Sequence, residues 1–317
     1  MNVTRKRPRR LYASNLVAPL IIVIMGAILA YGVSDKFQTE LTSRFTTDTQ
    51  DTLHLAAMKL DDYGDLLYAG RAFLSSSESI TAAEWRSFYN QQAIFERYPG
   101  VSSVTYVQSV PTAELGAFEA QMKSNDYFGP SYQLKQQSDR SSHGLVKMYL
   151  SRNDMTGVIG RDLWAEQSRY VVYEAAAAEG TVVASPPFKL ATGYDGFFSL
   201  LPVYRNNALD GYVLTSYRFD ELMRELFKDE SFGYRVTDVT TDVPQQLYEA
   251  RYTNGGYRSE QTVDVGGRRW KVEMRKDAEE RPVGYLLPAG ILATALVLAS
   301  ALYLLSIRPI RSTTKRK

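Results

Sequence analysis

Two long uncharged runs, one near each end of the chain, are the feature that most limits how this sequence can fold. Leu16–Val33 carries no charged residue over 18 positions, and Val283–Ile307 carries none over 25. A helix rises about 1.5 Å per residue, so each run can cross the roughly 30 Å hydrocarbon core of a bilayer. Two such runs predict transmembrane helices at residues 11–33 and 283–307.

The charges around these runs predict their orientation. Residues 1–10 and 308–317 each hold five Lys or Arg and no acid. The positive-inside rule therefore places both ends in the cytoplasm, at the inner or plasma membrane, and residues 34–282 on the far side. Without those ten cations the chain has a net charge near −8, which argues against nucleic-acid binding. A cleavable signal peptide is the alternative for the first run, and the length of the run disfavours it.

Cysteine is absent and histidine is scarce, and no set of residues typical of a catalytic or metal site stands out in the sequence. The chain has no cysteine, which excludes thiol catalysis and thiolate metal sites. An exported segment of this size can bury enough core to fold without disulfides. The two histidines, His54 and His143, are far apart in sequence, and we expect them on a stalk and a loop. We therefore expect no metal, no cofactor and no enzymatic activity.

Residues 34–79 have the pattern of one long stalk helix that continues from the first membrane run. Leucines recur every seven residues at Leu53, Leu60, Leu67 and Leu74, and the stretch from Phe37 to Phe45 has apolar residues four apart. This heptad seam is typical of two helices packed side by side. We expect its membrane-proximal half to form a homodimer. The alternative is that the stripe packs on the chain's own sheet.

The rest of the exported segment reads as an α+β protein with two tandem antiparallel sheets. Residues 80–218 predict a membrane-distal unit that starts with a capped helix at Thr81, and we expect its central helix to end at Gly180. Residues 219–282 predict a smaller membrane-proximal sheet. The strands that we expect in both units alternate in hydropathy and are separated by glycine-containing turns.

Three blocks of sequence carry a family resemblance. They read "YPGVSSVTYVQSVP", "GRDLWAEQSRYVVYEAAAAEG" and "ASPPFKLATGYDGFFSLLPVYRNNALDGYVLTSYRFDELM". In this order they resemble CHASE domains, the extracytoplasmic sensory modules of histidine kinases, diguanylate cyclases and plant cytokinin receptors, over about residues 80–226. The resemblance implies a long helix followed by two PAS-like sheets, usually in a homodimer. It also implies a small ligand in the distal sheet, adenine-like by analogy with the plant receptors.

The resemblance implies polar pocket residues. Thr192 matches the position of a pocket threonine in cytokinin receptors. Asp154 lies near the position of their ligand-binding aspartate, although an ungapped match falls on Asn153. An Asx-turn is the alternative role for either residue. Arg161 is a candidate to bind a ligand carboxylate or to form a structural ion pair, and we expect Asp162 to interact with the dipole of the central helix.

Apolar residues on the predicted strands are candidate pocket walls, because ligand pockets are mostly apolar with a few placed polar groups. The alternative for each is ordinary sheet core. The candidates are Tyr106, Met148, Leu150, Phe188, Leu190, Phe198 and Leu200.

The function that we expect is small-molecule sensing with transmission through both membrane helices. CHASE proteins normally continue into a kinase or cyclase, whereas ten residues follow Ile307 here. The output domain then lies outside this sequence, or a separate partner supplies it. Two other classes stay open: a two-pass assembly protein resembling a polysaccharide chain-length regulator, and an exported enzyme.

Overall fold

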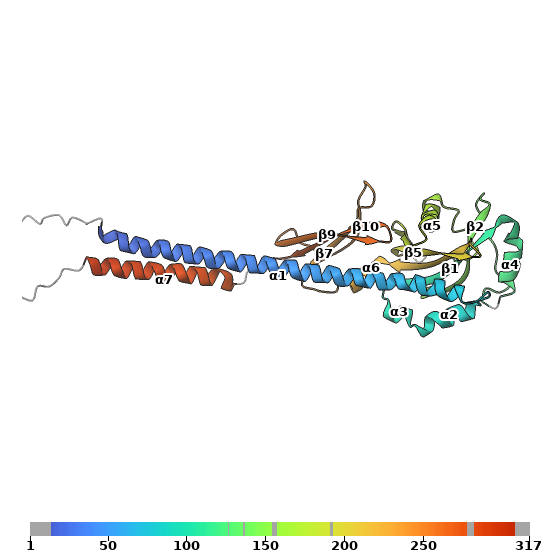
Figure 1. Ribbon diagram of the computed structural model, residues 1–317, viewed down its shortest axis with the longest axis horizontal. Coiled ribbons are helices and arrows are strands. Elements are labelled where there is room, and N and C mark those ends of the chain that lie inside the picture. Colours follow the sequence, from blue (N-terminus) through green and yellow to red (C-terminus); the bar gives the residue numbers. More distant parts are fainter. Residues whose placement is uncertain are drawn as a thin grey trace, which may run out of the picture. The chain divides into compact units, whose positions relative to one another are not determined.

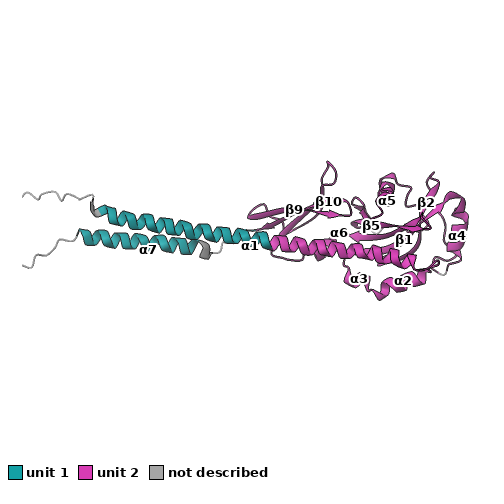
Figure 2. Ribbon diagram, in the orientation of Figure 1, with its two compact units in different colours: residues 1–47, 277–317 teal, residues 48–276 magenta. Residues whose placement is uncertain are grey.

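The computed structural model describes residues 14–125, 127–135, 137–153, 157–190, 193–277 and 282–307 (Figure 1). The chain divides into two units, residues 1–47 with 277–317 and residues 48–276 (Figure 2). The basic ends at 1–10 and 308–317 lie outside the described residues.

The order of the elements follows the predicted α+β plan. The helices are α1 (Ser14–Ser75), α2 (Ala82–Gln91), α3 (Ile94–Arg97), the 3-10 helix η1 (Thr112–Glu114), α4 (Leu115–Lys123), α5 (Gln167–Glu179), α6 (Phe219–Leu226) and α7 (Pro282–Ser306). The strands are β1 (Val101–Pro111), β2 (Ser142–Ser151), β3 (Val183–Ala184), β4 (Phe188–Lys189), β5 (Asp195–Arg205), β6 (Ala208–Arg218), β7 (Gly233–Asp238), β8 (Gln245–Ala250), β9 (Tyr257–Val265) and β10 (Arg268–Lys276).

The strands form two antiparallel sheets. The first has the order β2-β1-β6-β5-β3, with β4 also paired to β5, and the second has the order β8-β7-β10-β9. The stalk prediction is also confirmed, because α1 is one continuous helix of 62 residues. The fold class expected from the sequence is therefore correct: a long N-terminal helix, two antiparallel sheets and a C-terminal apolar helix.

The unit formed by residues 1–47 and 277–317 contains α7 and the first part of α1. Within the described residues, α1 and α7 are the two helices long and apolar enough to cross a membrane. They approach closely where Gly26 of α1 meets Ala295 of α7. A Cβ atom placed on Gly26 would lie 2.3 Å from the Cβ atom of Ala295. Small residues at such a contact let two membrane helices pack with their backbones close together.

In the unit formed by residues 48–276, the C-terminal half of α1 packs inside the chain. Leu53, Leu67 and Leu74 are at most 4% exposed. The hydroxyl of Tyr63 donates to the carbonyl of Pro99 at 2.5 Å, which fixes the helix beside the start of β1. From Leu53 onward, the heptad stripe therefore packs within its own chain, which was the alternative to a dimer. The spacing alone did not separate the two, because a helix buries leucines at the same spacing against a sheet as against a second helix.

Helix α2 packs against α1 at a glycine. A Cβ atom on Gly70 would lie 2.1 Å from the hydroxyl of Tyr89, which donates to the carbonyl of Leu66 at 3.2 Å. The predicted capping box starts α2: the backbone N–H of Glu84 donates to the Thr81 hydroxyl at 3.2 Å, and the Glu84 carboxylate accepts from the Thr81 N–H at 2.8 Å. Together with α1, α2 lies on one side of the first sheet (Figure 1).

Helix α5 covers the other face of the first sheet. Val172, Tyr173 and Ala176 of α5 form one buried cluster with residues of β5 and β6, including Phe198 and Leu214. The helix ends at Gly180, as predicted, with a φ of 71° that favours glycine. The first sheet therefore lies between helices on both faces.

The two sheets touch each other inside this unit. Phe197 of β5 stacks on Phe219 of α6 with ring centroids 5.2 Å apart, and Trp270 of β10 meets Phe197 edge-on at the same distance. The backbone N–H of Ala184 in β3 donates to the carbonyl of Gly266 in the β9–β10 turn at 2.9 Å. The first sheet is thus in direct contact with the second, so a movement of one sheet acts on the other.

Candidate functional site

A cavity of about 340 Å³ lies on the face of the first sheet that α5 covers. Its floor comes from four neighbouring strands, and the antiparallel register places Ser103 opposite Ser216 and Thr105 opposite Leu214. Because paired residues point to the same side of a sheet, these four side chains share one face. The residues of these four strands that line the cavity are Ser102, Ser103, Thr105, Val146, Phe198, Leu214 and Ser216.

The walls come from the segment before α5, from α5 itself and from the segment around β4. They contain three cations and no carboxylate among the described lining residues. The guanidinium of Arg169 lies over the ring of Phe188, 4.6 Å from its centroid. The wall residues are Gly157, Val158, Arg161, Leu163, Arg169, Tyr173, Phe188, Lys189 and Leu190.

Two of the three cations already have an acidic partner. Nε of Arg169 lies 3.0 Å from Glu166, and Nζ of Lys189 lies 2.8 Å from Asp195. Arg161 is exposed and forms no side-chain hydrogen bond or ion pair within the part of the chain that the structure describes. The cavity therefore has a positive wall and one guanidinium free to bind an anion.

The floor holds a polar group without a partner. Thr105 is 1% exposed, and its hydroxyl has no hydrogen-bond partner among the described residues. Leaving a buried hydroxyl unpaired costs about 1–3 kcal/mol. A hydroxyl both donates and accepts, so Thr105 is positioned to bind a polar group of a molecule in the cavity.

A buried hydrogen-bond cluster holds the wall segment in place. Asp162 accepts from His143 Nδ1 at 2.9 Å, from the backbone N–H of Gly144 at 3.0 Å, from that of Trp164 at 2.9 Å and from the Ser138 hydroxyl. Burial raises the pKa of the Asp162 carboxyl, but these hydrogen bonds outweigh it and the net pKa is lowered. The ionised form of Asp162 is therefore the one that the folded chain stabilises.

This cluster corrects two sequence predictions. Helix α5 begins at Gln167, so Asp162 lies outside its first turn and does not interact with its dipole as expected. His143 is on β2 rather than in a loop. Its Nε2 lies 3.0 Å from the Thr112 hydroxyl, so Asp162, His143 and Thr112 follow the carboxylate–imidazole–hydroxyl order of a hydrolase triad. The Thr112 hydroxyl, however, donates to the carbonyl of Arg140 at 2.9 Å. Neither Thr112 nor His143 lines the cavity.

The predicted site residues fall into four groups. Thr192 and Asp154 lie outside the described residues, and Asn153 is described but does not line the cavity. Leu200 is on the same face as the cavity, buried in the cluster under α5. Four predicted residues do line the cavity: Arg161, Phe188, Leu190 and Phe198.

The fourth group is on the face of the first sheet opposite the cavity. Tyr106 pairs with Met148, and Val104 pairs with Leu150, so these side chains alternate with those of Ser103 and Thr105. Tyr106 faces α2, where its ring lies 6.5 Å from that of Trp85. Tyr106, Met148 and Leu150 are therefore not walls of this cavity.

The sequence prediction missed the floor. Ser103 and Thr105 flank Val104 on β1, Ser216 lies on β6, and the first two are nearly fully buried. Small hydroxyl residues next to apolar ones on a buried strand were the available signal, because a buried polar group needs a partner. Arg169, on α5, was missed for a different reason: nothing in its sequence surroundings separates it from an ordinary exposed helix residue.

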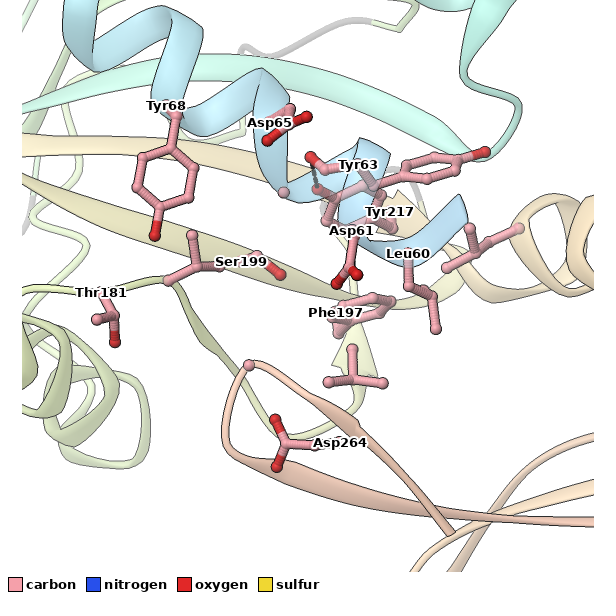
Figure 3. Close-up of a pocket in the computed structure, with 15 residues that line it drawn as sticks. Leu60, Asp61, Tyr63, Asp65, Tyr68, Thr181, Phe197, Ser199, Tyr217 and Asp264 are labelled. Carbon is pink, nitrogen blue, oxygen red and sulfur yellow. Dashed lines mark hydrogen bonds between the residues drawn. The ribbon is translucent and has the colours of Figure 1, made fainter. Parts of the chain in front are cut away.

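A second cavity, of about 400 Å³, lies between α1, the first sheet and the β9–β10 turn. Figure 3 shows Asp61 and Tyr68 extending from α1, with Asp264 on the hairpin opposite. Its described lining residues include Asp61, Asp65 and Asp264 and no Lys, Arg or His. The two cavities on the two faces of the first sheet therefore have opposite charge.

A comparison with known protein families identifies the family to which the chain belongs. A family model described as the CHASE domain matches residues 78–248, which is more than half of the chain. The chain belongs to the CHASE domain family. The match spans every strand of the first sheet, together with the cavity under α5, and reaches β8 of the second. No curated protein matches the chain.

Solved structures of chemoreceptor ligand-binding domains are similar to this chain. The domain of Pseudomonas fluorescens CtaA, in complex with L-serine, has a TM-score of 0.50 and 11% identity, and the alignment covers 77% of this chain and 100% of that one. The domain of Pseudomonas aeruginosa PctC, in complex with GABA, gives 0.44 and 15%, with 70% and 94% covered. The likeness to CtaA shows that this CHASE domain has the dCache-like fold.

Proposed function

We propose that this CHASE protein is an extracytoplasmic sensor that binds a small molecule in the cavity under α5. The observation that carries the proposal is the combination, in one cavity, of an uncommitted guanidinium at Arg161 and an unpartnered buried hydroxyl at Thr105. Without a ligand, the unpaired Thr105 hydroxyl lowers the stability of the folded state, and the Arg161 guanidinium has no partner among the described residues. The fold supports a ligand of metabolite size, because the CtaA domain was solved with L-serine.

The proposed topology has two membrane helices with both ends of the chain in the cytoplasm. The apolar helices α1 and α7 support two crossings, and the basic residues beyond each run support the orientation. The CHASE domain then lies outside the cytoplasmic membrane, where a sensor meets external metabolites.

Signal transmission is proposed to start at the first sheet. A ligand shifts the balance between two arrangements only by binding one of them more tightly. The cavity is on one face of the sheet, and α1 packs on the other, so a shift of the sheet acts directly on a helix that runs without a break from Ser14 to Ser75. Small slides or rotations of packed helices are a known form of such transmission. We propose a homodimer, and an output read beyond these residues or by a partner.

We also propose that the chain acts by binding and not by catalysis. Its strongest chemical grouping, Asp162 with His143, is buried away from the cavity and committed to holding the wall segment. An assembly role like that of a polysaccharide chain-length regulator is less well supported, because the CHASE match covers the cavity itself.

A pocket-blocking variant tests the proposal. The full chain in detergent is screened against a metabolite library by thermal unfolding, where a ligand at 100 times its Kd adds about 2.7 kcal/mol. Ser216→Trp fills the floor and is expected to abolish the shift, while Ser79→Trp, at an exposed position before α2, leaves it intact. A ligand that stabilises both variants equally would show that the cavity is not the binding site.

A further inference from the structure

The charge and hydrogen-bonding groups of the cavity under α5 define the class of molecule that it fits. We propose that it binds a small organic monocarboxylate bearing a hydroxyl or carbonyl group, with the carboxylate on Arg161 and the second polar group on Thr105. This inference rests on the proposed function, because it names the ligand class of the same cavity.

The cations of the wall select one carboxylate. Arg169 and Lys189 are already paired, with Glu166 at 3.0 Å and Asp195 at 2.8 Å, whereas Arg161 has no partner among the described residues. A guanidinium binds a carboxylate through two parallel N–H···O bonds. A second acid group on the ligand would have to break one of the existing ion pairs. One free guanidinium therefore fits a monocarboxylate.

The floor selects a second polar group. The Thr105 hydroxyl is buried without a partner, and Ser103 and Ser216 lie beside it on the same face of the sheet. An unsubstituted alkyl chain over this floor would leave Thr105 unpaired. A hydroxyl or carbonyl group on the ligand, at a distance from the carboxylate, gives Thr105 the hydrogen bond that the protein itself does not supply.

The remaining surface sets size and shape. A volume of about 340 Å³ is near the lower end of the range for ligand cavities. Phe198, Leu214 and Tyr173 provide apolar lining for the rest of the ligand. The acid is therefore short, with a few carbons between its polar groups. The second cavity, with Asp61, Asp65 and Asp264, repels the same anion.

The test compares acids with their amides on the full chain in nanodiscs. The probes are linear and aromatic acids of about three to eight carbons, with and without a hydroxyl or oxo group, their primary amides, and adenine. Hydroxy and oxo acids are expected to bind at least about tenfold more tightly than the amides, because a hydrogen bond to a charged group is worth more than one between neutral groups. Arg161→Gln removes that difference, Arg161→Lys keeps part of it, and Arg224→Gln, on the exposed face of α6, leaves it unchanged.

Thr105→Val tests the floor separately. It is close in shape and removes an unpaired buried hydroxyl, so the unliganded chain stays folded. Affinity for the substituted acids is expected to fall about two- to tenfold, and affinity for the unsubstituted acids to stay the same.

Three results would overturn the inference: equal binding of acids and amides, tighter binding of adenine than of the acids, or an unchanged preference for acids over amides in Arg161→Gln. The proposed function fails in a different way. If a neutral or cationic metabolite binds and Ser216→Trp blocks it, the ligand class is wrong and the sensor stands. If Ser216→Trp blocks no ligand that the chain binds, the sensor function of this cavity is wrong as well.

Discussion

His143 Nδ1 lies 2.9 Å from Oδ2 of Asp162, with both side chains at most 1% exposed. This contact joins β2 to the segment that forms the wall of the cavity, one residue away from Arg161. Asp162 acts as a positioning residue. It lines neither cavity, but its carboxylate accepts from the backbone N–H of Gly144 on β2 and from that of Trp164 in its own segment, which holds the wall segment against β2.

The first prediction concerns acid stability. The folded state lowers the pKa of Asp162, so its stabilising contribution is complete above the unfolded-state pKa of about 4 and is lost as the pH falls toward the lower folded value. Asp162→Asn is expected to cost about 2 kcal/mol at neutral pH, typical of a lost charged hydrogen bond. It should also flatten the loss of stability below about pH 4.

Chemical denaturation of the full chain between neutral and acid pH measures both effects. Glu78→Gln, at an exposed position after α1, is the control and should follow the wild type. An Asp162→Asn curve parallel to the wild type at acid pH would mean that this carboxylate is not the group being titrated.

The second prediction concerns the contact between α1 and α2. Gly70→Ala places a methyl group 2.1 Å from the Tyr89 hydroxyl, which is fully buried and bonded to Leu66. We expect a loss of about 1–3 kcal/mol from overpacking. Gly64→Ala is the matched control on the same helix, because nothing lies within 4 Å of the new methyl group. It should gain about 0.5–1 kcal/mol from helix propensity, and equal effects at the two sites would contradict the packing described.

The third prediction concerns the membrane helices. The chain has no native cysteine, so Gly26→Cys with Ala295→Cys introduces a single pair of thiols. Oxidation in membranes should protect both from alkylation, because the two positions are in contact. Gly32→Cys with Ala295→Cys is the control. Gly32 has no atom within 4 Å of an added Cβ and lies about 9 Å further along the axis. Equal protection of both pairs would mean that the close approach at Gly26 is not specific.

The fourth prediction concerns the proposed homodimer. Phe37 and Leu41 are half-buried on α1, in the part of the seam where a second copy is expected. Phe37→Cys or Leu41→Cys should give disulfide-linked dimers in membranes. Leu67→Cys, fully buried in its own chain, should not. If neither Phe37→Cys nor Leu41→Cys forms a dimer, the seam is intramolecular along its whole length.

Local signals made the elements predictable from the sequence. The two uncharged runs, the capping box at Thr81 and Glu84, and Gly180 at the end of α5 each determine a helix through neighbouring residues. The cavity depends on which strand residues share a face, and that is set by the register between strands far apart in sequence. Tyr106 was therefore assigned to the cavity while its neighbour Thr105 was missed.

The heptad leucines were ambiguous for a similar reason. A helix buries the same stripe whether it meets a sheet or another helix, so spacing alone did not separate the two for Leu53, Leu67 and Leu74. The Asp162–His143 contact joins residues on different elements, and no local pattern predicts it.

The location of the CHASE domain outside the cytoplasm is the claim on which the sensor account most depends. Gly255→Cys places the only thiol of the chain in the exposed β8–β9 turn, where an added Cβ meets no atom within 4 Å. Labelling of intact cells with a membrane-impermeant maleimide is the direct measurement. The account predicts full labelling without permeabilisation, and labelling only after the membrane is opened would contradict it.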